Sequence, residues 1–151
     1  VVGRAEAADL IKQYFGIYPG VQAYMQECVA LARSRGYTET LMGRRRYLRD
    51  LQSNNAAVRA FAERNAINAP IQGSAADLIK VAMIRVDQGL RDQGLQSKLL
   101  LQVHDELVLD QAPGEEKVLG DLVRREMIGA GSLLVPLVVD LGRGPDWLSA
   151  H

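Results

Sequence analysis

The sequence predicts an α+β fold in which long packed helices are joined to antiparallel hairpins. Apolar residues recur at helical spacing through residues 20–35 and 75–90, as expected of helices that bury one face. Two other runs, residues 37–48 and 99–110, each have a short link at their centre and are typical of hairpins. The chain has 151 residues, which is enough for one domain with a modest core.

The individual elements follow from local start and stop signals. Gly36 stops the second helix because glycine commonly adopts the left-handed conformation that ends a helix. Asn54 or Asn55 can cap the third, and Pro70 interrupts it because proline removes a backbone hydrogen bond. The expected helices cover residues 5–15, 20–35, 55–67, 74–94 and 113–128, with a last strand at 136–141. The last helix is expected to turn Val118, Leu122, Val123 and Met127 inward.

The run Leu99–Asp110 combines apolar arms with a polar centre. The arms are expected to lie in the core, and His104, Asp105 and Glu106 fall at the bend between them. Ionised carboxylates close to buried surface are costly unless they are paired or bind a metal. We therefore expect Asp105 and Glu106 to face a cleft and a cation. The alternative is a polar hairpin tip with no further task.

A second group of polar residues is spaced four apart. Arg64, Asn68 and Gln72 form a row along one helical face, and the neighbouring positions are rich in alanine, which would let a duplex or another backbone approach closely. Arginine, asparagine and glutamine can donate to acceptor atoms on base edges, and minor-groove acceptors occur at every base pair. The row is therefore suited to holding DNA of any sequence. It is also compatible with an ordinary solvated helix face.

The charge pattern allows two interpretations as well. The chain has no net charge, whereas a freestanding nucleic-acid binder is usually basic. Locally, Arg33–Arg64 carries a net charge of +5 and Asp105–Glu126 a net charge of −4. One basic and one acidic segment suit a protein that holds both a polyanion and metal ions, but they also suit two solvated faces.

Cysteine usage and hydropathy point to a cytoplasmic protein. Cys28 is the only cysteine, so an internal disulfide and a CxxC metal site are excluded. No apolar run approaches the length of a membrane span, and no signal segment opens the chain. The chain starts at Val1 rather than at a methionine, so we expect it to be a fragment of a longer chain.

Several short motifs occur in a characteristic order. The most specific are QGSAAD at residues 72–77 and QVHDELV at residues 102–108. With these motifs the chain closely resembles the C-terminal palm segment of the family A DNA polymerases, the family of bacterial DNA polymerase I. The other matching runs are YPGV at 18–21, TLMGRRRYL at 40–48, ER at 63–64, INAPI at 67–71, VPL at 135–137 and DW at 146–147. Arg49 departs from the proline common in the family, which should alter a loop and not the chemistry.

The resemblance implies a role for each polar group. Residues 103–107 resemble motif C of the palm, with Asp105 as a catalytic, metal-binding carboxylate and Glu106 as a nearby, less essential acid. His104 is similar to the residue that contacts the primer end. The residues implied to contact the duplex are Arg64, Asn68 and Gln72 in its minor groove, together with Arg46. Arg44 and Arg45 are either solvated or paired internally.

The same resemblance implies the ligands and partners of the complete enzyme. These are two Mg²⁺ ions, primer–template DNA, deoxynucleoside triphosphates and the remainder of the polymerase chain, with no membrane. Residues 1–151 would form the C-terminal part of the polymerase domain, namely part of the palm and the adjoining helices. The expected function is template-directed DNA synthesis by two-metal nucleotidyl transfer.

Two components of such an enzyme have no counterpart in this sequence. The family's second metal-binding aspartate belongs to motif A, and the nucleotide is held by a separate helix. Asp110 cannot replace that aspartate because five extended residues span about 16 Å, and the resemblance gives Asp140 no catalytic place. We therefore expect the chain to be inactive alone. The alternatives are a segment of a single-subunit RNA polymerase and a non-catalytic DNA-binding or assembly subunit.

Overall fold

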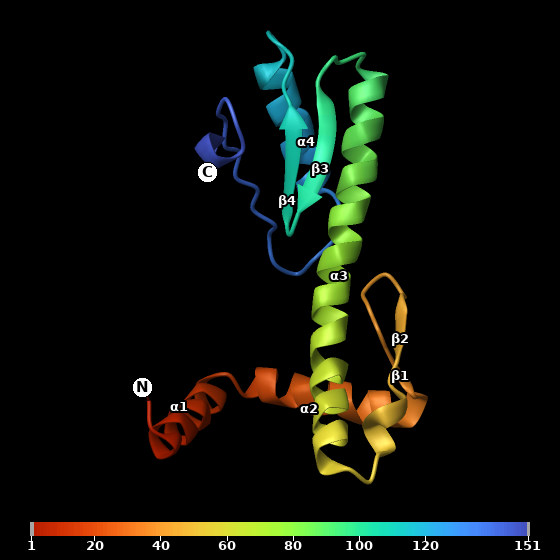
Figure 1. The fold of residues 1–151 in the computed structure, drawn as a ribbon, viewed down its shortest axis with the longest axis vertical. Helices are drawn as coiled ribbons and strands as arrows, with labels where there is room; N and C mark the ends of the chain where they lie inside the picture. The colour runs from red at the N-terminus through yellow and green to blue at the C-terminus, as the bar shows by residue number, and fades with distance from the viewer. Residues whose placement is uncertain (1, 151) are drawn as a thin grey trace. The chain divides into compact units, whose positions relative to one another are not determined.

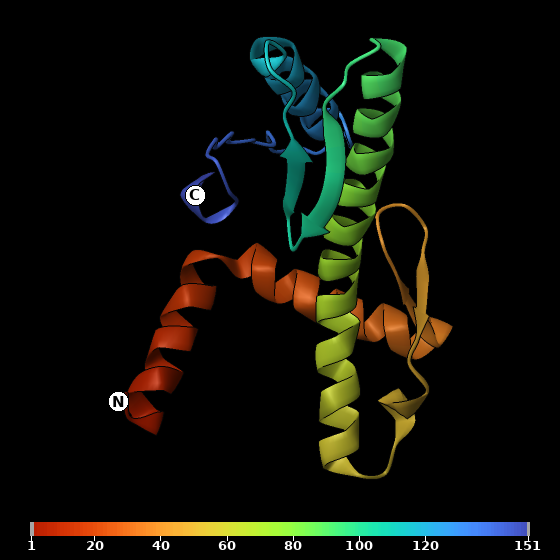
Figure 2. The same ribbon diagram turned by 45° about the horizontal axis from the view of Figure 1, so that its top comes forward.

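The computed structural model describes residues 2–150 and has the expected α+β composition, with helices and two separate antiparallel hairpins. The chain divides into two compact units, Val1–Gly73 and Ser74–His151. Figures 1 and 2 show the elements of both units in two orientations. The long helix α3 contributes its first half to one unit and its second half to the other.

The first unit begins with two helices, α1 (Arg4–Ile17) and α2 (Pro19–Arg35). Pro19 occupies the first position of α2. A backbone N–H at this position would make no hydrogen bond within the helix, so proline costs nothing there. Gly36 ends α2 with a φ of 78°, as the sequence predicts. Helix α1 is three residues longer than expected, since it begins at Arg4 and runs through Gly16 to Ile17, and α2 is one residue longer.

The first hairpin follows α2 directly. Strands β1 (Tyr37–Glu39) and β2 (Arg45–Tyr47) pair antiparallel, with Thr38 opposite Arg46. A short 3₁₀ helix, η1 (Arg49–Gln52), then leads toward α3. The departure from the family pattern at Arg49 therefore lies at the start of this connecting helix.

Helix α3 (Ala56–Asp92) is continuous, so the expected interruption at Pro70 is wrong. Its start is as predicted, because Asn55 Oδ1 accepts a hydrogen bond from the Ala57 amide at 2.9 Å. Proline removes one helical hydrogen bond, but tertiary contacts can compensate for that loss. The hairpin β1–β2 supplies such contacts through Thr38 and Arg44.

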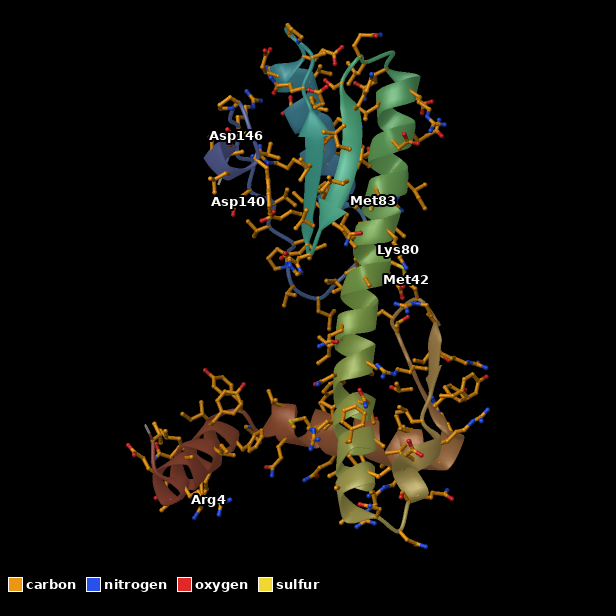
Figure 3. All side chains as sticks on the ribbon, in the orientation of Figure 1. Arg4, Met42, Lys80, Met83, Asp140 and Asp146 are labelled. Atoms are coloured by element: carbon orange, nitrogen blue, oxygen red, sulfur yellow. The ribbon has the colours of Figure 1, made fainter. Side chains whose placement is uncertain are left out.

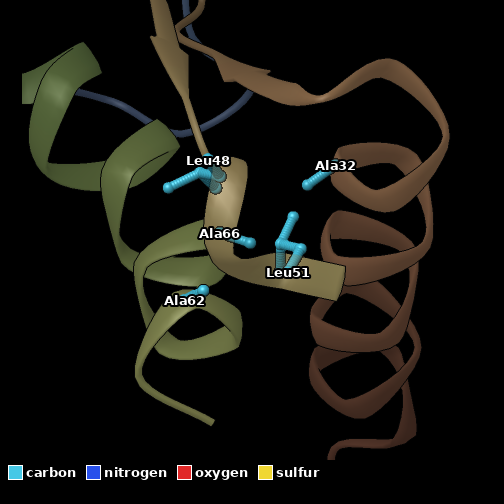
Figure 4. Close-up of a cluster of buried hydrophobic side chains, with 5 residues drawn as sticks. All are labelled: Ala32, Leu48, Leu51, Ala62 and Ala66. Carbon is cyan, nitrogen blue, oxygen red and sulfur yellow. The ribbon is translucent and has the colours of Figure 1, made fainter. Parts of the chain in front are cut away.

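The core of the first unit is built from small residues of α2 and α3 around two leucines (Figure 4). Ala62 and Ala66 of α3 are buried, so the alanines at these positions pack within the protein rather than against a duplex. The full set of buried residues in this cluster is Ala32, Leu48, Leu51, Ala62 and Ala66.

The second unit pairs strands β3 (Lys98–Val103) and β4 (Glu106–Asp110) and adds helix α4 (Glu116–Ile128). Its core joins Val86 and Leu90 of α3 to residues of α4, and Gly89 lets the two helices approach closely. A Cβ at Gly89 would lie 2.5 Å from Leu122 Cδ1.

Three expectations for this unit need correction. Leu119, and not Val118, faces the core alongside Leu122 and Val123. The hairpin arms are only partly buried, because Leu99, Leu107 and Leu109 pack against the core while Leu100 and Leu101 are 57% and 49% exposed. Residues 136–141 form no strand.

The C-terminal segment ends in a short 3₁₀ helix, η2 (Leu148–Ala150). Across residues 2–150, no helix combines the length and the apolar character needed to cross a membrane.

Candidate functional site

The turn between β3 and β4 consists of His104 and Asp105, two of the three residues that the sequence places at the bend, and Glu106 is the first residue of β4. Val103 and Glu106 form the last pair of the ladder, so two residues close the hairpin. His104 has a φ of 52° and is the one non-glycine residue with positive φ in the described chain. Gln102 Nε2 donates to the His104 carbonyl oxygen at 2.7 Å and supports the turn. A histidine therefore stands where glycine or asparagine would be less strained.

The three polar residues at this turn differ in their surroundings. His104 and Asp105 are exposed, whereas Glu106 is partly buried. Trp147 Nε1 donates to Glu106 Oε2 at 3.3 Å, so the C-terminal segment touches the proposed acidic site. His104 and Asp105 can therefore reach a ligand, whereas the Glu106 carboxylate is held by its hydrogen bond from Trp147.

The turn that carries Trp147 has its own support. Asp146 Oδ1 accepts hydrogen bonds from the hydroxyl and the amide of Ser149, both at 2.8 Å. The Ser149 hydroxyl, followed by the Ser149 amide, lowers the pKa of Asp146. The ionised carboxylate of Asp146 therefore closes this turn beside Trp147.

The acidic residues at the hairpin have the chemistry of magnesium ligands. Carboxylate oxygens are the hard ligands that Mg²⁺ prefers, and Asp105 and Glu106 supply them from adjacent positions. Among residues 2–150, no three His, Cys, Asp or Glu side chains gather as a metal site. Asp110 pairs with Lys98 at the far end of the ladder. Figure 3 labels Asp140 and Asp146 on the C-terminal segment and not at the turn.

The row on α3 is exposed along its length. Arg64, Asn68 and Gln72 all face solvent, while Ala62, Ala66 and Ala69 are buried on the other side of the helix. The Arg64 guanidinium lies 5.8 Å from the centre of the Phe61 ring. The three residues of the predicted row therefore lie on the solvent-exposed face of α3, and the opposite face of the helix packs into the first unit. It lies in Val1–Gly73 and the acidic turn in Ser74–His151.

The arginines of the first hairpin have different partners. Arg45 Nε donates to Glu39 Oε2 at 2.8 Å, and its guanidinium stacks 4.6 Å from the centre of the Tyr37 ring. Arg44 Nη2 donates to the Gly73 carbonyl oxygen at 3.0 Å. Arg44 and Arg45 are therefore paired internally and at the same time exposed to solvent. Arg46 is exposed on β2.

Sequence reasoning missed two contacts at these surfaces. Trp147 belongs to a matching motif, but no local pattern links it to Glu106, which lies 41 positions earlier. Arg44 and Gly73 are also far apart in sequence. Gly73 carried a signal, since glycine inside a helix indicates a close approach by another group.

The chain belongs to DNA polymerase family A. The sequence model of this family matches residues 1–149. The chain is 52% identical over 149 residues to DNA polymerase I of Mycobacterium tuberculosis, a match that covers 99% of this chain and 16% of the relative. It is 52% identical to the Geobacillus stearothermophilus enzyme, with 99% and 17% covered. The chain thus spans about one sixth of the length of these curated relatives.

A solved structure has the same fold. It is described as the POL domain of Pol1 from M. smegmatis in complex with DNA primer-template and dNTP. The TM-score is 0.96 at 53% identity, and the match covers 98% of this chain and 26% of that one. The α+β arrangement is therefore that of a polymerase domain fragment.

Proposed function

We propose that residues 1–151 form the C-terminal part of a family A polymerase domain, comprising part of the palm and the adjoining helices, within a longer chain. In the complete enzyme this part contributes to template-directed DNA synthesis in the cytoplasm. The observation that carries the proposal is the exposed Asp105 at the two-residue turn of β3–β4, within a chain that matches the family over residues 1–149.

Asp105 is proposed as the metal-binding carboxylate of this segment, with Glu106 as a second, less essential oxygen donor. Mg²⁺ ions held by these carboxylates would stabilise the charge that develops on the attacking and leaving oxygens of the displacement. The turn holds the Asp105 carboxylate outward, and the bond from Trp147 orients Glu106. His104, beside Asp105, donates from its imidazole to the primer end.

The row Arg64, Asn68 and Gln72 is proposed to hold the primer–template duplex from its minor groove, with Arg46 as a further DNA contact. The groove presents purine N3 and pyrimidine O2 acceptors at every pair, so donors in this row contact any sequence. The exposure of all three side chains supports this role. The structure of the M. smegmatis relative contains DNA primer-template and dNTP, which supports these two partners.

The family match also bears on the alternative functions. The curated relatives are named DNA polymerase I, which favours a DNA polymerase over a single-subunit RNA polymerase. A non-catalytic DNA-binding subunit would share the α3 row but would not need Asp105. Loss of synthesis on replacing Asp105 therefore separates catalysis from binding alone.

The 151-residue chain is proposed to be inactive by itself. Asp105 is one of two aspartates that a paired metal site needs, and the chain's net charge of zero limits counterion release and hence affinity for DNA. A primer-extension assay with the purified chain, primed template, Mg²⁺ and four nucleotides is expected to give no extended product. Template-dependent extension that copurifies with the chain would contradict this.

The proposed catalytic role is tested by Asp105→Ala in the complete polymerase. We expect nucleotide incorporation to be abolished while binding to primer–template stays close to wild type. Asp110→Ala is the matched control, because Asp110 lies at the far end of the same strand pair and should leave incorporation largely intact. Incorporation by Asp105→Ala within about tenfold of wild type, or about 1.4 kcal/mol, would refute the assignment.

A further inference from the structure

Pro70 lies inside α3 without ending the helix. Proline has no backbone N–H, so the carbonyl of Ala66, four residues earlier, cannot receive the usual helical bond. The Thr38 hydroxyl of β1 donates to this oxygen over a long contact of 3.4 Å. Thr38 is buried, and a buried carbonyl without a donor would be costly. The first hairpin thus supplies a donor where the helix lacks one.

The hairpin contacts α3 a second time beyond the proline. Arg44 Nη2 donates to the Gly73 carbonyl oxygen at 3.0 Å. Gly73 also allows Thr40 to approach the helix closely, since a Cβ there would lie 2.6 Å from Thr40 Cγ2, closer than carbon atoms can pack. Thr40 in turn accepts from the Arg44 amide at 3.1 Å and holds the end of the hairpin.

These two contacts lie on either side of two members of the α3 row. Ala66 precedes Asn68, and Gly73 follows Gln72. We propose that the β1–β2 hairpin is a positioning element that fixes the course of α3 through Pro70 and so aligns Asn68 and Gln72 for the minor groove. This inference rests on the proposed function, and it assigns Thr38, Thr40, Arg44 and Gly73 as positioning residues.

The alignment has a clear physical need. A proline within a helix commonly produces a kink. Side chains four apart share a face only while the helix keeps its course. A bend between Asn68 and Gln72 would turn one donor away from acceptors that the other still reaches.

The sharpest test uses Gly73→Ala in the complete polymerase. Alanine favours a helix over glycine, so helix propensity alone predicts a gain in stability, whereas the clash with Thr40 predicts displacement of the hairpin. Efficiency of the next incorporation is measured on two primers, one natural and one ending in a 3-deazapurine, which lacks the N3 acceptor. We expect about a fivefold loss on the natural primer, the scale of a modest hydrogen bond, and much less on the modified one.

Restoring space should restore function. Thr40→Ser removes Cγ2 but keeps the hydroxyl that accepts from the Arg44 amide, so Gly73→Ala with Thr40→Ser is expected to regain most of the wild-type efficiency. Thr38→Val gives a second route, since Thr38 is buried and its hydroxyl donates to the Ala66 carbonyl of α3. It should show the same dependence on the primer end, while Thr38→Ser should be close to wild type.

The outcomes separate the hairpin's role from the minor-groove role. Gln72→Ala must itself lose more incorporation efficiency on the natural primer than on the modified one. If its losses are equal, both the minor-groove role and this inference are overturned. If Gln72→Ala behaves as expected but Gly73→Ala and Thr38→Val lose nothing, or lose equally on both primers, the positioning role of the hairpin alone is overturned.

Discussion

Trp147 donates its indole N–H to the Glu106 carboxylate across 41 positions of sequence, with 3.3 Å between Nε1 and Oε2. Glu106 is the first residue of β4 and the neighbour of Asp105 at the turn. The Asp146–Ser149 bonds hold the turn that carries Trp147. The C-terminal segment therefore orients the second carboxylate of the proposed metal site.

We expect Trp147→Phe to weaken metal use without abolishing synthesis. Phenylalanine keeps an aromatic ring but removes the donor, and one hydrogen bond of about 1 kcal/mol corresponds to a severalfold change in an equilibrium. The Mg²⁺ concentration for half-maximal incorporation should rise by about that factor. In a Glu106→Gln background the same substitution should have little further effect. An equal shift in both backgrounds would show that Trp147 acts elsewhere.

His104 should trade stability against function. Its φ of 52° is strained for a residue with a side chain and is unstrained for glycine. His104→Gly should raise the free energy of unfolding by up to about 1 kcal/mol and yet reduce primer extension, because the imidazole is lost. Urea unfolding and extension assays check the two effects, with His104→Asn as the control that tolerates the turn. A less stable variant that extends primers normally would contradict both parts.

Glu115 ties the start of β3 to the start of α4. Its carboxylate accepts a hydrogen bond from the backbone N–H of Gln96 at 2.8 Å and one from the Ser97 hydroxyl at 2.6 Å. Ser97 is buried, and its hydroxyl accepts from the Ala112 amide at 2.9 Å. These hydrogen bonds lower the pKa of Glu115, with the largest effect from the backbone N–H of Gln96 and smaller effects from the hydroxyl and the backbone N–H of Ser97.

A lowered pKa gives a definite pH dependence. The folded state favours the ionised carboxylate, so its contribution to stability is present above the ordinary value of 4.5 and is lost as the pH falls through the lowered pKa. Glu115→Gln should therefore melt at a lower temperature than wild type at pH 7. The difference should shrink steadily below pH 4.5. Melting curves of the 151-residue chain would contradict this if the difference stayed constant down to pH 2.

Local signals predicted the elements that depend on neighbours in sequence. The apolar arms and polar centre of residues 99–110 predicted the β3–β4 turn at His104 and Asp105, and the spacing of four predicted the exposed row on α3. Asn55 and Gly36 marked helix ends correctly. These features depend on backbone preference and periodicity, which a sequence displays directly.

The wrong expectations depend on contacts between distant residues. Pro70 does not break α3, and Thr38 of the distant strand β1 donates to the carbonyl that proline leaves without its helical donor. Residues 136–141 alternate like a strand, but in the described part of the second unit the sheet consists of β3 and β4 alone, and this segment joins neither edge of it. The Trp147–Glu106 hydrogen bond joins residues 41 positions apart, so no local sequence pattern could predict it.

The metal preference of Asp105→Cys in the complete polymerase tests most directly whether Asp105 binds a metal ion. Thiolate favours softer ions than carboxylate does, so the rate of incorporation with Mn²⁺ relative to Mg²⁺ should rise by at least about tenfold over wild type, the scale on which changes at a metal site act. Asp110→Cys, the matched control, should keep the wild-type ratio. An unchanged ratio in Asp105→Cys, with measurable incorporation, would contradict the assignment of Asp105 as a metal ligand.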